Sequence, residues 1–101
     1  MSTRPLFVPL RAKFFEAFEA GAKSEEFRPY GPRWNERTCP VGRPVVLSYG
    51  YGKARRLRGV VVSFRVITDP AQLPIGWREC YGDRHATACA IGVDVIRDPQ
   101  P

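Results

Sequence analysis

The stretch RAKFFEAFEAGAKSEEFR, residues 11–28, decides the fold, because it places a helix, a glycine and a strand in succession. Phe14 and Phe18 are four residues apart and share one face of a helix, which predicts that the stretch begins helically. Gly21 then ends the helix, because glycine adopts a left-handed backbone conformation at little cost. Aromatic residues and a proline favour an extended conformation over residues 23–30.

Outside this stretch, short apolar runs separated by glycine- and proline-rich segments predict further strands, while residues 77–85 show no clear pattern. The expected elements are a strand over 6–10, a helix over 11–20, a strand over 23–30, a loop over 31–43, strands over 44–49 and 57–67, a loop or single helical turn over 69–76, and a strand over 87–97. Alternation along the longest strand assigns its buried face to Val60, Val62, Phe64 and Val66. The side chains expected in the core are Phe14, Phe18, Val60, Val62, Phe64, Ile91, Val93 and Val95.

This order of elements predicts an α+β fold, with a mostly antiparallel, barrel-like sheet and one main helix after the first strand. A chain of 101 residues has room for one core, so we expect a single domain over residues 1–101 with its core over about 4–97. No apolar run approaches the ~20 residues that span a bilayer, and the N-terminal segment lacks the long apolar region of a signal peptide. We therefore expect a cytoplasmic protein without a membrane partner.

The charge of the chain favours a polyanionic partner. Lysine and arginine number 16 against 10 aspartate and glutamate residues, which gives a formal net charge of +6. Only Lys13, Lys23 and Lys53 are lysines, and the guanidinium groups of the other basic residues suit phosphate binding and stacking on bases. A coding sequence rich in G and C would produce the same bias towards arginine without a functional cause, so the bias alone leaves both explanations open.

The three cysteines are expected to be free thiols, because their number is odd and they form no CxxC pair. Cys80, His85 and Cys89 follow a C-x4-H-x3-C spacing that faintly resembles a zinc knuckle. The leading CxxC pair is absent and Cys89 falls on the expected buried face of the last strand, so we interpret it as a structural cysteine and expect no metal. We also expect no cofactor, because the sequence contains neither a Walker loop nor a G-x-G-x-x-G pattern.

Residues 21–28, GAKSEEFR, fit the pattern G-x-K-x-x-E-x-R that marks the ASCH domain, and they lie between the main helix and the next strand, as in that family. Segments 41–48 and 58–62 are similar to the paired barrel strands of the same family. The resemblance extends over about residues 4–97. It implies a PUA-like fold, in which a cleft beside the motif receives RNA or a nucleobase.

The residues of the motif suit such a cleft. Glu26 and Arg28 are two positions apart in an extended segment, so their side chains point to the same face. Lys23, with Ser24 beside it, lies where the chain turns into the strand, and its ammonium group can swing towards the same place. A carboxylate and two cations suit a base edge together with a phosphate. The same spacing also fits a structural ion pair that closes the end of a barrel, and the sequence leaves both interpretations open.

Resemblance to the wider superfamily also implies hydrolysis as an alternative function. Some of its members look like amidohydrolases that deacylate acetylcytidine, with a threonine nucleophile three residues after the lysine and a glutamate on a later strand. Glu26 occupies the threonine position here, and residues 44–68 contain no acidic side chain. Lys23 and Glu26 could still activate water as catalytic residues, or act with Arg28 in a ribonuclease. We prefer a binding module and retain a small hydrolase as the alternative.

Two loops interleave aromatic and basic residues, which is typical of proteins that bind single-stranded nucleic acid. Trp34 lies among arginines, and two tyrosines with a run of cations occupy the turn that follows Ser48. The alternative is that Trp34 and Tyr49 cap the ends of the barrel and that the arginines are only solvated. The candidate ligand-binding residues are Lys23, Ser24, Glu26, Arg28, Trp34, Tyr49, Tyr51, Lys53, Arg55, Arg56 and Arg58, and the expected partner is RNA, a nucleotide or a nucleoside.

Overall fold

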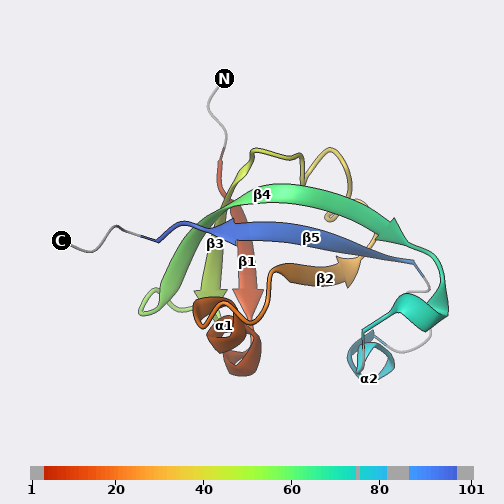
Figure 1. Cartoon of the computed structure of the whole chain (residues 1–101), viewed down its shortest axis with the longest axis horizontal. Coiled ribbons are helices and arrows are strands. Elements are labelled where there is room, and N and C mark those ends of the chain that lie inside the picture. Colours follow the sequence, from red (N-terminus) through yellow and green to blue (C-terminus); the bar gives the residue numbers. More distant parts are fainter. Residues whose placement is uncertain (1–3, 75, 82–86, 98–101) are drawn as a thin grey trace.

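The chain forms a curled, five-stranded mixed sheet and two helices (Figure 1). The computed structural model describes residues 4–74, 76–81 and 87–97. Its elements are β1 (Leu6–Leu10), α1 (Ala12–Glu19), β2 (Glu25–Pro29), β3 (Pro44–Tyr49), β4 (Arg56–Ile67), a 3₁₀ turn (Pro70–Gln72), α2 (Trp77–Tyr81) and β5 (Ala88–Val95). Among the described residues, no helix is long and apolar enough to cross a membrane.

The strands lie in the order β1-β3-β4-β5-β2, so β1 and β2 form the two edges of the sheet. β1 pairs with β3 in parallel, and the other three pairings are antiparallel. The α+β class and the curled, mostly antiparallel sheet are therefore as expected, and the sheet forms a half-barrel. In Figure 1, α1 and α2 are seen below the sheet, at opposite ends of β2.

Helix α1 packs against β1 and β3 and buries Phe15 and Phe18 in the core. The prediction for Phe18 is confirmed, whereas Phe14 is only partly buried, because it faces a cleft beside β2. The helix ends as expected at Gly21, whose φ of +80° is the left-handed conformation that glycine tolerates. The backbone amide of Gly21 donates to the carbonyl oxygen of Phe18, and the chain turns directly into β2.

The predicted phase of β4 is wrong over most of the strand. Val61 is fully buried, whereas Val62 is 50% exposed and Val66 is 43% exposed. Two facts explain the error. The run VVV at residues 60–62 carries no alternation of apolar and polar residues, and a β-bulge lies between Val61 and Ser63, where the register with β5 shifts. Phe64, beyond the bulge, is only partly buried although it packs against the core, and Val60 is also only half-buried.

Strand β5 is an inner strand of the sheet, between β4 and β2, and is buried on both faces over most of its length. Ile91 and Val93 belong to the main core, as predicted, and Val95 packs against its edge. Ala88 and Ala90 point to the other face, where they form a smaller apolar cluster with residues of β4 and α2. Burial of both faces explains why the sequence of this strand is almost continuously apolar.

The approach of β4 to β5 is close enough to require glycine at one position. A Cβ atom on Gly59 would lie 2.8 Å from the backbone oxygen of Asp94 and 2.8 Å from a methyl carbon of Val93. Both neighbours belong to the central strand β5, which is held on either side by β4 and β2. Gly59 therefore allows the two longest strands to coil closely around each other.

Candidate functional site

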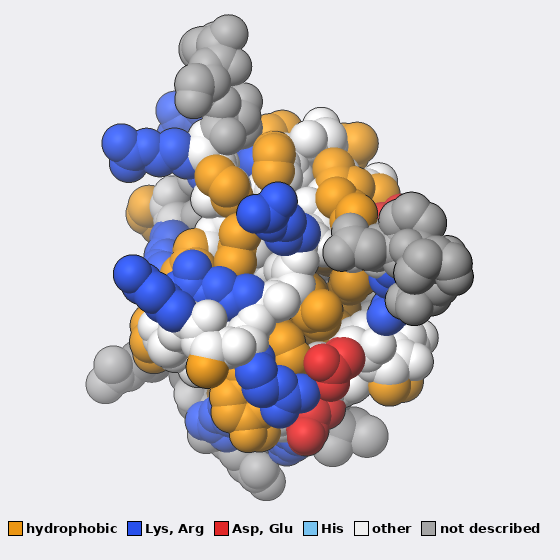
Figure 2. Space-filling view, turned by 90° about the vertical axis from the view of Figure 1, so that its left-hand side faces the viewer, with side chains coloured by type: hydrophobic (Ala, Val, Ile, Leu, Met, Phe, Trp, Pro, Cys, Tyr) orange, Lys and Arg blue, Asp and Glu red, His pale blue; other side chains and the backbone are white. Residues whose placement is uncertain are grey.

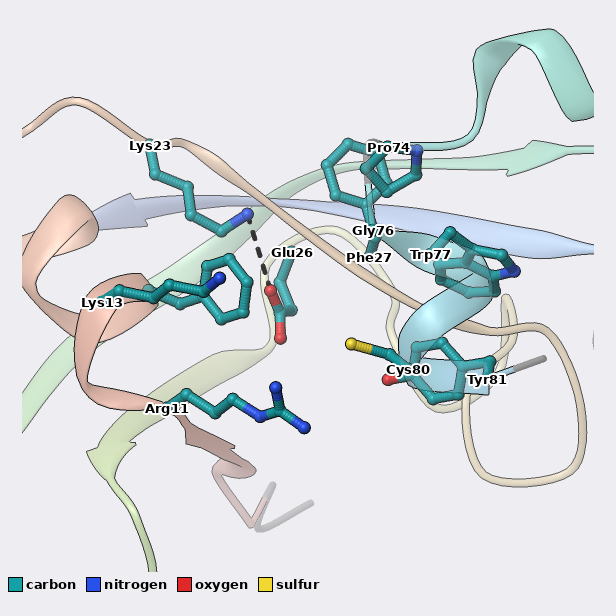
Figure 3. Close-up of a pocket in the computed structure, with 11 residues that line it drawn as sticks. Arg11, Lys13, Lys23, Glu26, Phe27, Pro74, Gly76, Trp77, Cys80 and Tyr81 are labelled. Atoms are coloured by element: carbon teal, nitrogen blue, oxygen red, sulfur yellow. Dashed lines mark ion pairs between the residues drawn. The ribbon is translucent and has the colours of Figure 1, made fainter.

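A cleft of about 420 Å³ opens between α1 and α2, with Glu26 of β2 in its centre (Figure 3). The cleft exists because β2 is an edge strand that turns its last residues away from α1, while α2 returns over the same edge from the far end of β4. In Figure 3 the cationic side chains enter from the α1 side and the aromatic rings of α2 stand opposite them. The lining residues are Arg11, Lys13, Phe14, Lys23, Glu26, Phe27, Pro74, Gly76, Trp77, Cys80 and Tyr81.

The carboxylate of Glu26 is buried, and its two oxygens have different surroundings. The Oε2 oxygen accepts from Arg28, with Nη2 at 2.8 Å and Nε at 3.0 Å. The Oε1 oxygen has the Lys23 ammonium nitrogen at 3.7 Å, which is an ion pair beyond the length of a good hydrogen bond. Oε1 is therefore the oxygen that retains accepting capacity towards the cleft.

Arg28 does more than pair with Glu26. Its Nη2 atom also donates to the carbonyl oxygen of Pro9 on β1, at 2.7 Å. β1 and β2 are the two edges of the half-barrel, so the guanidinium group bridges the edges that backbone pairing leaves apart. Glu26 and Arg28 therefore form the structural ion pair at the open side of the barrel, and the same pair also lies at the cleft.

Lys23 is held at the cleft by aromatic rings. Its ammonium nitrogen lies 5.2 Å from the ring centre of Phe14, 5.6 Å from that of Phe18 and 5.2 Å from that of Phe27. Attraction between a cation and the face of an aromatic ring fixes the side chain, which is 18% exposed. The predicted convergence of Lys23, Glu26 and Arg28 at one place is thus observed.

Sequence reasoning missed the cations at the rim of the cleft, Arg11 and Lys13. Both are exposed, and neither forms an ion pair with any carboxylate of the described residues. They precede or begin α1, where the sequence analysis gave attention only to the apolar face of the helix. Their spacing from Phe14 was the available signal, because residues on either side of an aromatic that faces a cleft line its mouth.

The residues of α2 were also missed. The rings of Trp77 and Tyr81 lie 4.4 Å apart, centre to centre, and line the wall of the cleft that faces α1. Burial raises the pKa of Tyr81 above its usual value, so its phenol stays protonated near neutral pH. Cys80 is exposed on the same wall. A helix of five residues is too short to produce a periodic sequence pattern, which explains why the sequence did not indicate it.

A smaller hollow of about 180 Å³ adjoins the main cleft along the end of β1. Pro9, Leu10 and Arg28 line it in addition to residues that the two hollows share. The shared residues are Arg11, Phe14, Glu26, Cys80 and Tyr81. The cleft therefore extends from α2 across Glu26 to the strand β1.

Trp34 does not take part in the cleft. It is 6% exposed and belongs to the main core, with the guanidinium carbons of Arg28 and Arg33 at 4.9 Å and 5.3 Å from the ring centre. Its ring is covered on the inside of the barrel, so the structural alternative describes Trp34 better than a stacking face for a ligand. Ser24 is exposed and its backbone oxygen accepts from the amide of Val93, outside the residues that line the cleft.

The remaining candidates lie together on β3, β4 and the turn between them, away from the cleft. They are Tyr49, Tyr51, Lys53, Arg55, Arg56 and Arg58. Arg55 forms an ion pair with Glu19 at 2.9 Å and stacks on the rings of Tyr49 and Phe15. Figure 2 views the side of the molecule where this turn lies, and shows basic side chains spread among hydrophobic ones, with acidic groups mostly confined to the lower part. The candidates therefore divide into two regions.

The described residues contain no group of three or more histidine, cysteine, aspartate or glutamate side chains placed to hold a metal ion. Among the residues with the zinc-like spacing, His85 lies outside the described residues. Cys89 is fully buried, as expected for a structural cysteine. Burial, with a smaller contribution from Cys39, raises the pKa of Cys89 from 9.0 to about 12. The Cys89 thiol is therefore neutral at physiological pH.

The fold and cleft define a small α+β protein built on a curled five-stranded half-barrel sheet. No family model matches the chain, and no curated protein matches it. Among solved structures it is similar to the crystal structure of hypothetical protein PH0355, with a TM-score of 0.69 and 17% sequence identity over 92% of this chain and 100% of that one. At this level of identity the likeness shows the fold alone.

Proposed function

We propose that the chain is an ASCH-type domain with a PUA-like fold, and that its cleft binds RNA or a nucleotide through one base and one phosphate. The observation that carries the proposal is the carboxylate of Glu26, a largely buried group that lines the cleft while Arg28 fixes one of its oxygens and leaves Oε1 able to accept. A buried carboxylate oxygen is stabilised by a donor, and within the cleft a ligand can supply one.

An exocyclic amine of a base is a suitable donor, because carboxylates accept from the amine of cytosine in nucleic-acid recognition. The Lys23 ammonium group beside Oε1 supplies a donor for a neighbouring ring nitrogen or carbonyl oxygen of the same base. The half-buried ring of Tyr81 offers aromatic surface opposite α1, with the buried ring of Trp77 packed against it, and stacking contributes roughly 1–3 kcal/mol per base. The cleft volume of about 420 Å³ lies within the roughly 300–1,000 Å³ of small-molecule sites.

The phosphate belongs at the rim, with Arg11 and Lys13. Lys23 and Arg28 already neutralise Glu26, so these two cations are the ones free to neutralise a ligand. The Lys13 ammonium lies 5.0 Å from the ring centre of Phe14, at the mouth of the cleft. A base bound at Glu26 and a phosphate bound at the rim together describe a nucleotide rather than an isolated base.

Cys80 provides a direct test, because it is the exposed cysteine and lines the cleft. Alkylation of Cys80 is followed by mass spectrometry with and without each nucleoside monophosphate. At least one nucleotide is expected to slow the reaction, and Glu26→Gln is expected to weaken its binding about tenfold or more, because a charged acceptor is lost. Glu25→Gln is the matched control, since Glu25 pairs with Arg65 and does not line the cleft. No protection by any nucleotide, or equal effects of the two substitutions, would remove the proposal.

Hydrolysis is tested by the same variants. The cleft of the described residues has no threonine or serine lining it, and one oxygen of Glu26 is fixed by Arg28, so we expect slow turnover of acetylcytidine or none. Glu26→Gln is expected to weaken ligand binding more than it lowers any turnover. Rapid deacylation that both Lys23→Ala and Glu26→Gln abolish would instead make the protein a hydrolase.

A further inference from the structure

The outer face of the sheet carries aromatic and basic residues that do not themselves line the cleft. Phe7 on β1 pairs with Val46 on β3, which pairs with Arg58 on β4. The residues that precede and follow these along each strand are buried, so this row lies on the face away from the core. Arg56 lies on the same face, two residues before Arg58.

Phe7 is the centre of a small stack. The guanidinium carbon of Arg56 lies 5.4 Å from the ring centre of Phe7, and the ring of Tyr51 lies 6.3 Å from it. Tyr51 is 80% exposed at the turn between β3 and β4. A half-buried aromatic ring flanked by an exposed second ring and a guanidinium plane is an arrangement on which an unstacked base can stack.

The cations of this face are available to a ligand. Lys53, Arg56 and Arg58 are exposed, and within the described part of the chain none of them pairs with a carboxylate. By contrast, Arg55 and Arg65 on the same two-stranded segment are both paired with glutamates. The chain has a net charge of +6, and these three cations around Phe7 are not paired with carboxylates of the described residues. The surface is therefore complementary to phosphates.

Strand β1 links the stack to the smaller hollow. Pro9 lines the smaller hollow that adjoins the cleft, and Phe7 lies two residues before it on the same face of β1. Residues two apart on a strand are separated by about 7 Å. A strand of nucleic acid that leaves the cleft past Pro9 therefore reaches Phe7 next.

We propose that the ligand is a single-stranded nucleic acid, with one base in the cleft and a neighbouring base stacked on Phe7, where Arg56 and the cations beside it contact the backbone. The inference rests on the proposed function of the cleft and extends it, because a free nucleotide would use the cleft alone. The contacts involve base faces and phosphates, so they do not distinguish RNA from DNA.

The test compares binding of cytidine monophosphate and of a cytidine hexanucleotide, by titration at several salt concentrations; the best monophosphate from the alkylation assay and its hexamer replace them if another base is preferred. The hexamer is expected to bind at least about tenfold more tightly, because a second base stacks and further phosphates are neutralised. Phe7→Leu, which keeps the apolar volume, and Arg56→Ala are each expected to weaken hexamer binding about tenfold. Both variants should bind the mononucleotide as the wild type does.

Arg65→Ala is the control, because it removes the same charge from β4 at a residue that is paired with Glu25. It should leave both affinities unchanged, whereas Arg56→Ala should also lower the salt slope of hexamer binding by about one unit. A DNA hexamer should bind about as well as RNA, and failure of DNA to bind would contradict the named contacts.

The two proposals fail in different ways. This inference is overturned if the hexamer binds no more tightly than the mononucleotide, or if Phe7→Leu and Arg56→Ala leave its affinity unchanged. If mononucleotide binding still depends on Glu26 in that case, the cleft proposal stands. Hexamer binding that depends on Phe7 and Arg56 but is unaffected by Glu26→Gln overturns the cleft proposal and the continuous path together.

Discussion

Arg28 satisfies two acceptors that belong to different parts of the fold, the carboxylate of Glu26 and the backbone carbonyl of Pro9. Its planar guanidinium group can serve both because its donors point in fixed, divergent directions. A lysine at this position would offer three donors on one nitrogen, without the planar fork that brings both Nε and Nη2 to the carboxylate. The arginine of the motif is therefore explained by the structure of the half-barrel as well as by the cleft.

We predict that Arg28→Ala lowers the free energy of unfolding by about 2–4 kcal/mol, because it leaves the buried Glu26 carboxylate with Lys23 alone and unpairs the carbonyl of Pro9. Chemical denaturation measures the change. The surface pair of Arg65 and Glu25 gives the comparison, since Arg65→Ala should cost less than about 1 kcal/mol. Similar losses for both substitutions would show that Arg28 does not hold the edges together.

At the scale of the elements, the sequence predicted the helix and all five strands to within a few residues, because their apolar patterns and glycine boundaries were clear, but it assigned the wrong face of β4 to the core. It misassigned β4, where three consecutive valines gave no phase and the bulge after Val61 changed the register. The short α2 was not predicted at all. One half of the cleft, around Lys23 and Glu26, could be predicted from a local motif, and the other half, around Trp77 and Tyr81, required the tertiary return of α2 to β2.

The packing of β4 on β5 leads to a prediction for Gly59. Gly59→Ala should lower the free energy of unfolding by about 1–3 kcal/mol, because the new methyl group overlaps the Asp94 backbone and a methyl carbon of Val93. Gly52→Ala is the control, since a methyl group there meets no atom within 4 Å in the described structure and should change stability by less than about 1 kcal/mol. Both are measured by chemical denaturation. Equally small losses of stability for both substitutions would mean that β5 shifts to accommodate the new methyl group without strain.

At the scale of the whole molecule, burial of Cys89 links stability to alkaline pH. The pKa of its thiol is about 12 in the folded protein and 9.0 as an unperturbed thiol. Below pH 9 the thiol is protonated in both states, and its contribution to stability is fully present. As pH rises from 9 towards 12 the thiol ionises only in unfolded chains, so the free energy of unfolding falls by up to about 1.4 kcal/mol per pH unit.

Denaturation curves at several values between pH 8 and 11 test this link by comparing wild type with Cys89→Ala. The variant is expected to be less stable at pH 8, since a buried side chain is truncated, but to lose stability less steeply as pH rises. The difference in slope is the informative quantity, because tyrosine and lysine residues titrate equally in both proteins. Parallel slopes would mean that the Cys89 thiol ionises as readily in the folded protein as in the unfolded one.

The strand order determines when the cleft can form during synthesis on the ribosome. β2 carries Glu26 and is paired in the sheet with β5, which lies near the other end of the chain. During synthesis the residues of β2 emerge early, and they have no sheet neighbour until β5 has been translated and released. The helix α1 can form in the meantime, but the carboxylate at the centre of the cleft acquires its fixed position only in the last stage. A nascent chain stalled before β5 therefore presents its cations and aromatic rings before the cleft has formed.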